Sequence, residues 1–177
     1  ILLFSTPTVL GASRIKTEFA ASDQRYYFVP CPHCDVFQTL EWENVRWSDL
    51  GLAPHDAVYV CPHCEGAIDN FQKTDMLARG EWRPTAEARN PKTVGYRLNG
   101  LYRPHGWRSW GDIATDWVEA QRTKDVSKLR VLVNTDLGEL WDVADGQSAD
   151  PTTLAGRRED YTATCDERIS VITAGVD

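Results

Sequence analysis

The word Cys-Pro-His-Cys occurs twice in this 177-residue chain, at Cys31–Cys34 and at Cys61–Cys64, with 26 residues between the copies. A Cys-x-x-Cys turn directs two thiolates toward one centre and leaves backbone N–H groups free to hydrogen-bond the sulfurs. Two such turns, brought together by a β-hairpin, give four thiolates in a tetrahedron, the arrangement that Zn²⁺ favours. Disulfides or a redox pair are the alternatives, but the repeated word favours a structural zinc site. Its ligands would be Cys31, Cys34, Cys61 and Cys64.

Apolar and aromatic runs beside both Cys-Pro-His-Cys copies predict short strands. The two cysteine turns, called knuckles below, and their flanking strands would then make a zinc ribbon. The strands are expected at Tyr26–Val29, Val36–Trp42 and Val58–Val60. His33 and His63 are expected to point outward rather than to bind the metal, because four sulfurs complete the tetrahedron. Gly66 follows the second word where a positive φ is useful, and Asp35 stands in that neighbourhood of the first.

Composition is that of a folded protein. The chain is 42% hydrophobic and holds seven tryptophans, which favours a packed core over disorder. It has no run of about 18 apolar residues, so no membrane span is predicted. Five cysteines, four of them in metal spacing, fit a reducing compartment. The apolar runs Ile1–Phe4 and Ile169–Asp177 resemble strands of larger sheets, and we expect an internal piece of a longer protein.

The segment Arg79–Arg108 concentrates positive charge in a chain whose formal net charge is −7. It contains seven basic and two acidic residues, whereas the other 147 residues hold 12 basic and 24 acidic ones. Trp82, Tyr96, Tyr102 and Trp107 lie between the basic residues. Such a segment could contact DNA phosphates, but a solvated surface is the more common reason for it and the one we favour.

The remaining pattern predicts an α+β fold with a helical connector after the ribbon. A short helix is expected at 13–21, another at Asp75–Arg79 with Thr74 as its N-cap, and a strand at Thr93–Leu98. Further helices are expected to begin at Ser109, to include Leu129, Leu132 and Val133, and to begin at Asp150–Pro151.

Hydroxyl residues follow the first predicted strand, at Ser5, Thr6 and Thr8. The carboxyl ends of strands are where parallel α/β sheets place ligand contacts, and in a nucleotide motor such residues can sense the terminal phosphate. A short Ser/Thr/Pro run is also a common turn, and this alternative stays open.

The chain carries an ordered set of short sequence motifs along nearly its whole length. In these motifs and their order it resembles the large terminase subunit of lambda-like tailed phages and prophages. The words, beside the two Cys-Pro-His-Cys copies, are Ser5-Thr6-Pro7, Ser22-Asp23-Gln24-Arg25, Asn134-Thr135-x-Leu137-Gly138-Glu139, Arg158-Glu159-x-Tyr161 and Thr173-Ala174-Gly175-Val176-Asp177. In that family an N-terminal ATPase drives double-stranded DNA through the portal into an empty capsid. A C-terminal nuclease of the ribonuclease H-like fold cuts the concatemer.

The resemblance implies a division of this chain. Residues 1–25 would end the ATPase domain, 26–82 would form the zinc ribbon and a short helix, 83–168 would form a strand and helical connector, and 169–177 would be the first nuclease strand. Ser5 and Thr6 would belong to the ATPase coupling motif. Asp177 would be the first metal-binding carboxylate of the nuclease, which uses two metal ions.

The same resemblance implies cofactors and partners for the parent protein. It would use Mg²⁺ and ATP, assemble as a homo-oligomeric ring in the host cytoplasm, and act with double-stranded DNA, the small terminase subunit and the portal of the procapsid. No membrane partner is expected.

The chain departs from the complete family pattern. It contains no Gly-x-x-x-x-Gly-Lys-[Ser/Thr] phosphate loop and only one of the nuclease carboxylates. We therefore expect this polypeptide alone neither to hydrolyse ATP nor to cut DNA. The alternative function is a freestanding zinc-ribbon module that binds nucleic acid or protein through Arg79–Arg108.

Overall fold

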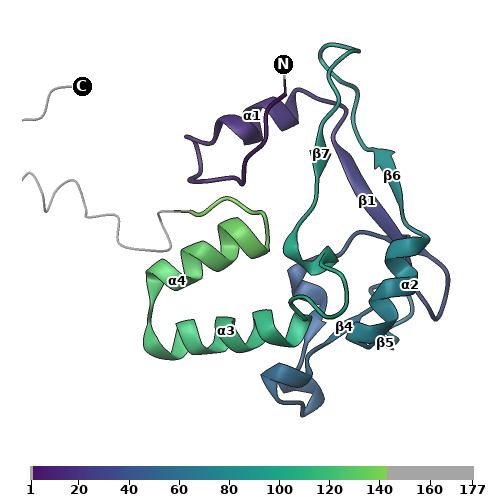
Figure 1. Ribbon diagram of the computed structural model, residues 1–177, viewed down its shortest axis with the longest axis vertical. Coiled ribbons are helices and arrows are strands. Elements are labelled where there is room, and N and C mark those ends of the chain that lie inside the picture. The colour runs from purple at the N-terminus through teal and green to yellow at the C-terminus, as the bar shows by residue number, and fades with distance from the viewer. Residues whose placement is uncertain (1, 143–177) are drawn as a thin grey trace, which may run out of the picture. The chain divides into compact units, whose positions relative to one another are not determined.

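The computed structural model describes residues 2–142, and residues 1 and 143–177 lie outside the described part. Helix α1 (Arg14–Ala20) is followed by five strands: β1 (Arg25–Pro30), β2 (Phe37–Gln38), β3 (Val45–Arg46), β4 (Val58–Val60) and β5 (Ala67–Ile68). Then come α2 (Lys73–Ala78), β6 (Glu81–Pro84), β7 (Tyr96–Arg97), α3 (Trp110–Thr123), α4 (Val126–Val131) and a π-helical turn at Leu132–Asp136. The described residues form a mixed α+β fold, which confirms the predicted class (Figure 1).

Strand β1 organises the first sheet. β6 pairs antiparallel with Arg25–Phe28, while β7 runs parallel beside Arg25 and Tyr26, and β2 pairs with Val29 and Pro30. The strand predicted at Thr93–Leu98 is therefore present but short. Because side chains alternate along a strand, Tyr26 and Tyr27 lie on opposite faces of this sheet.

The second sheet has the order β3-β4-β5, and Tyr59 is fully buried at its centre. The Tyr59 hydroxyl donates to the Thr39 carbonyl at 3.1 Å and accepts from the Asn44 amide at 3.1 Å. This hydroxyl thus holds the segment that connects β2 to β3.

The strand predicted at Val36–Trp42 is wrong beyond Gln38, where β2 ends. Side chains from a distant segment bind the backbone of Leu40 instead of a neighbouring strand. The Leu40 N–H donates to the Tyr102 hydroxyl at 2.8 Å, and the Leu40 carbonyl accepts from the Asn99 amide at 2.9 Å. These bonds satisfy the buried backbone groups that a strand would have paired.

Helix α3 lies beside β4 of the second sheet (Figure 1). Its first residue, Trp110, is fully buried. The Trp110 ring centroid lies 5.5 Å from that of Tyr59, and its indole N–H donates to the Leu101 carbonyl at 3.0 Å. The next residue, Gly111, lies so close to the turn at Pro54–Asp56 that an added Cβ would be 2.1 Å from the His55 carbonyl oxygen. Glycine at this position therefore allows the helix to approach.

The predicted start of α3 at Ser109 is confirmed. The Ser109 hydroxyl accepts from the Asp112 N–H at 3.0 Å, and the Asp112 carboxylate accepts from the Ser109 N–H at 2.7 Å, which is a capping box. The predicted N-cap of α2 is wrong, because α2 begins at Lys73 and Thr74 lies within it. The chain enters α2 from a 3₁₀ turn at Asn70–Gln72, which supplies the first turn of helix.

The chain ends give a mixed result. Helix α1 lies where a helix is expected, but Leu2–Phe4 form no strand, and the side chains of Leu2 and Phe4 are 92% and 98% exposed. A strand needs a neighbour for its backbone groups, and residues 2–142 place none beside this segment. The helix expected from Asp150 lies outside the described residues.

No helix within 2–142 combines the length and the apolar character that crossing a bilayer requires.

Candidate metal centre

Each Cys-Pro-His-Cys word forms the turn of a β-hairpin. The first joins β1 to β2 and the second joins β4 to β5. In the first knuckle the Asp35 N–H donates to the Cys31 carbonyl at 2.9 Å, and Glu65 and Cys61 repeat this bond at the same distance. The flanking strands also have the same register, with pairs Pro30–Phe37 and Val60–Ala67. The two knuckles are therefore structural copies.

The fold brings the four predicted cysteines together, with all four sulfurs within 4.8 Å of one another. The sulfurs of Cys31 and Cys64 are 3.8 Å apart, and those of Cys34 and Cys61 are 4.0 Å apart. A tetrahedral ion with Zn–S bonds of about 2.3 Å requires sulfurs about 3.8 Å apart. The donor set and its spacing thus fit zinc. Cys31 and Cys61 are buried whereas Cys64 is exposed, so one side of the cluster faces solvent.

The thiols of this cluster differ in acidity. Burial raises the pKa of the Cys31 thiol to about 12. Burial also acts on Cys61, but the backbone N–H groups of His63 and Cys64 and the neighbouring thiols outweigh it and lower the pKa of Cys61 to about 7. Backbone N–H groups that face the sulfurs favour the thiolate, the form that binds a metal.

The positive φ after the second word occurs at Glu65, not at Gly66, so that expectation is wrong. Glu65 and its counterpart Asp35 both have φ of 59°. Gly66 is needed for space instead: an added Cβ would lie 2.7 Å from Cδ2 of His33 and 3.3 Å from the sulfur of Cys64.

His33 and His63 are both exposed, and the group of four clustered ligand atoms is made of the cysteine sulfurs alone. The two are nevertheless not equivalent. Nε2 of His33 lies 2.8 Å from the Ala67 carbonyl oxygen, which can only accept a hydrogen bond. The repeated motif gives both histidines the same expectation, and the difference between Gly66 and Val36 at the equivalent place gains its meaning from the contact across the hairpins.

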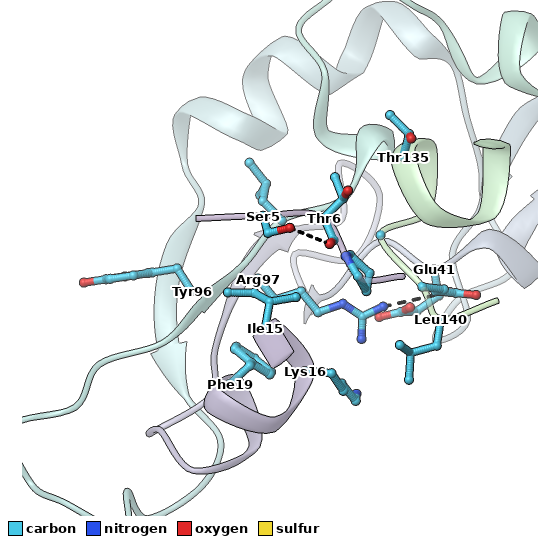
Figure 2. Close-up of a pocket in the computed structure, with 14 residues that line it drawn as sticks. Ser5, Thr6, Ile15, Lys16, Phe19, Glu41, Tyr96, Arg97, Thr135 and Leu140 are labelled. Atoms are coloured by element: carbon cyan, nitrogen blue, oxygen red, sulfur yellow. Dashed lines mark hydrogen bonds and ion pairs between the residues drawn. The ribbon is translucent and has the colours of Figure 1, made fainter. Parts of the chain in front are cut away.

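Ser5 and Thr6 line a second feature, a pocket of about 340 Å³. Figure 2 shows the Arg97 side chain extending along this pocket, with Ser5 and Thr6 on one side of it and Phe19 and Lys16 on the other. Arg97 pairs with Glu139 at 3.9 Å, and burial raises the pKa of the Glu139 carboxyl. Ser5 and Thr6 are exposed, and the Ser5 hydroxyl donates to the Thr6 carbonyl at 2.9 Å.

The backbone beyond this pocket joins the two ends of the described chain. The Leu10 N–H donates to the Trp141 carbonyl at 3.0 Å, and the Trp141 N–H donates to the Thr8 carbonyl at 2.9 Å. The segment that follows Ser5 and Thr6 is therefore bonded directly to the last described residues.

Carboxylates neutralise most of the basic segment Arg79–Arg108. Five of its seven cations form ion pairs: Arg79 with Asp35, Arg83 with Glu81, Arg97 with Glu139, Arg103 with Asp136, and Arg108 with Asp116 and Asp136. Within residues 2–142, Arg89 and Lys92 make no ion pair, and both are exposed in the β6–β7 loop. This pairing supports the interpretation of the segment as a surface rather than as a phosphate-binding site.

Asp136 is a structural residue that sequence reasoning missed. Its side chain is 8% exposed and pairs with Arg103 and, at 3.3 Å, with Arg108. A buried carboxylate requires such partners. Asp177, the expected nuclease carboxylate, lies outside the described residues.

Two family models, both of the phage terminase large subunit, match successive parts of the chain. Residues 1–82 match the family model of the phage terminase large subunit gpA, ATPase domain, and residues 93–177 match that of the terminase large subunit gpA, endonuclease domain. No solved structure matches the chain.

Curated relatives agree with these two models. The chain is 30% identical to the terminase large subunit of Escherichia phage lambda and 29% identical to that of Enterobacteria phage P21, with 98% of the chain aligned in each case. It spans 30% and 29% of the lengths of these relatives. The chain therefore belongs to the phage terminase large subunit family, whose members carry an ATPase and an endonuclease domain.

Proposed function

We propose that this chain links the ATPase to the nuclease of a terminase large subunit through a structural zinc ribbon. The parent protein would package double-stranded DNA into the capsid with ATP and Mg²⁺ and would cut the concatemer. One observation carries the link: four sulfurs lie within 4.8 Å in a fold to which both matched segments contribute. β1, in the ATPase-matched segment, pairs with β7, in the nuclease-matched segment.

Zinc would supply stability that the two knuckles lack. β2, β3 and β5 each span two residues, which is too little to hold a hairpin by strand pairing alone. A structural zinc can contribute on the order of 10 kcal/mol to the folding of a small unit. Cys31, Cys34, Cys61 and Cys64 would hold the ion, and its role would be rigidity rather than chemistry.

Ser5, Thr6 and Asp177 are proposed to keep the roles that the family resemblance implies. Ser5 and Thr6 would belong to the coupling motif of the ATPase, and their exposed position beside a pocket supports contact with a further part of the parent protein. Asp177 would bind a nuclease metal ion. Its place within the segment that matches the endonuclease model supports this role.

The proposed partners follow from family membership. The parent protein would form a homo-oligomeric ring in the host cytoplasm. It would contact DNA, the small terminase subunit and the portal. We also propose the division of the chain into the end of the ATPase domain (1–25), the zinc ribbon and short helix (26–82), the strand and helical connector (83–168) and the first nuclease strand (169–177).

Metal analysis tests the zinc ribbon. We expect the purified, reduced chain to hold one zinc per molecule, and Cys31→Ser or Cys61→Ser to lose the zinc and unfold the ribbon. Cys165→Ser is the matched control, because this fifth cysteine is outside both words. Unchanged melting and metal content in Cys61→Ser would rule out the proposal.

Activity assays test the remaining part. We propose that this chain alone neither hydrolyses ATP nor cuts DNA, since it has no phosphate loop and only one nuclease carboxylate. ATP hydrolysis by the purified chain that Ser5→Ala/Thr6→Ala abolishes, or DNA cleavage that Asp177→Asn abolishes, would contradict this, whereas turnover that persists in these variants comes from a contaminant.

A further inference from the structure

One hydrogen bond between the two knuckles breaks their symmetry. His33 and His63 occupy the same place in identical words, yet only the His33 imidazole bonds across to the other hairpin, with Nε2 donating to the Ala67 carbonyl at 2.8 Å. Among residues 2–142 the His63 imidazole makes no hydrogen bond. Identical words thus place identical side chains in different environments.

The residue two places after each second cysteine explains this difference. In the second hairpin it is Gly66, and an added Cβ there would lie 2.7 Å from Cδ2 of His33. In the first hairpin the same place holds Val36, which carries the Cβ that Gly66 lacks. His63 consequently cannot lie against the first hairpin as His33 lies against the second.

We propose that His33 is a positioning residue for the candidate metal centre, fixing the separation of the two cysteine pairs. The inference rests on the proposed zinc site and adds a residue that the four-cysteine pattern does not contain. His33 precedes Cys34, and Ala67 lies three residues after Cys64 in the hairpin of the other pair, so the bond spans the centre. The other hydrogen bonds between the knuckles, within the described residues, are the weak thiol contacts of Cys31 with Cys64 and of Cys34 with Cys61.

The bond also sets the state of the imidazole. A carbonyl oxygen only accepts, so Nε2 of His33 carries the proton, and Nδ1 has no part in this contact. Groups that orient metal ligands without touching the metal change metal affinity by about 10- to 100-fold when they are removed. His33 acts in this way through the backbone of β5 rather than through a ligand side chain.

Zinc affinity of the full chain, measured by competition with a chromophoric chelator, tests the proposal. We expect His33→Ala to weaken zinc binding about 10- to 100-fold and the matched variant His63→Ala to change it less than about threefold. His33→Gln, whose amide can donate to the same carbonyl, recovers part of the affinity. The absorption bands of bound Co²⁺ should shift in His33→Ala and stay unchanged in His63→Ala.

A double-mutant cycle with Gly66→Ala examines the contact itself. We expect Gly66→Ala to weaken zinc binding strongly when His33 is present and distinctly less in the His33→Ala background, because the added Cβ then loses its nearest neighbour. Equal effects of His33→Ala and His63→Ala, or strictly additive effects in the cycle, would overturn the role of His33. Failure of the unaltered chain to bind zinc would instead overturn the zinc site itself.

Discussion

The Tyr102 hydroxyl joins Leu40 to Tyr27, accepting from the Leu40 N–H at 2.8 Å and donating to the Tyr27 carbonyl at 2.7 Å. One phenol oxygen thereby holds the segment after the first knuckle against the central strand of the first sheet. Because the oxygen is buried, water cannot replace it when it is removed.

Tyr102→Phe should therefore destabilise the fold by about 1–3 kcal/mol, since it leaves the buried Leu40 N–H without its acceptor and removes the donor to the part-buried Tyr27 carbonyl. Thermal or urea unfolding measures the change. Tyr26→Phe is the matched control, because the Tyr26 hydroxyl makes no hydrogen bond within the described residues and should cost little. Equal losses in the two variants would mean that the hydroxyl of Tyr102 is not what holds Leu40.

The buried carboxylate of Asp136 should matter more than any exposed one. Asp136→Ala leaves Arg103 and Arg108 without this partner. Both arginine side chains are about 30% exposed, so we expect a loss of about 1–3 kcal/mol after solvent screening. Glu87→Ala, at an exposed residue with no ion pair in residues 2–142, is the control. Unfolding midpoints that fall equally in both variants would contradict this account.

Lys73 should destabilise the fold at neutral pH. Its side chain is fully buried, its Nζ has no hydrogen-bond partner within residues 2–142 and lies 4.6 Å from the Trp110 ring centroid, and burial lowers its pKa from 10.5 to about 8. The folded state then binds this proton less tightly than the unfolded state does. The contribution of Lys73 to stability should consequently rise with pH between about 8 and 10.5.

Lys73→Met isolates this effect. At pH 7 we expect the variant to be more stable by about 1–3 kcal/mol, a range that allows for the lost contact with Trp110. Its advantage should shrink as pH rises from 8 toward 10.5, whereas other titrating groups cancel in the difference. A constant difference across this pH range would show that Lys73 keeps its ordinary pKa in the folded chain.

Replacing the ion-paired and the unpaired cations of Arg79–Arg108 in separate variants should distinguish a role in stability from a role in DNA binding. Arg103→Ala should lower the unfolding midpoint because it breaks the pair with Asp136. Arg89→Ala/Lys92→Ala should leave the midpoint unchanged, since these side chains make no ion pair in the described chain. Salt-dependent DNA binding by the folded chain that this double variant abolishes would favour the alternative of a freestanding binding module.

What the sequence predicts well is local. The sulfur cluster follows from the two Cys-Pro-His-Cys motifs, because each turn positions its own two thiols. The remaining requirement is that the two hairpins pack against each other. The start of α3 at Ser109 follows from a capping box with Asp112, three residues away. Such features depend on neighbours in the chain, and their spacing is visible without a structure.

What the sequence does not predict depends on distant partners. The strand expected through Leu40 ends early because Asn99 and Tyr102, some sixty positions later, bind its backbone. The role of Asp136 follows from its pairing with Arg103 and Arg108, which lie about thirty positions earlier in the chain. The unequal roles of His33 and His63 require knowing that Gly66 faces one imidazole across the two hairpins.

The pairing of β1 with both β6 and β7 bears on how this protein could be taken apart. The match to the ATPase model stops at residue 82, within β6, and the match to the endonuclease model starts at residue 93, in the β6–β7 loop. A protease nick in that loop would leave two pieces that still share a sheet and should co-elute until a denaturant parts them. The border between the two matched segments therefore crosses a single sheet instead of separating two independently folded parts.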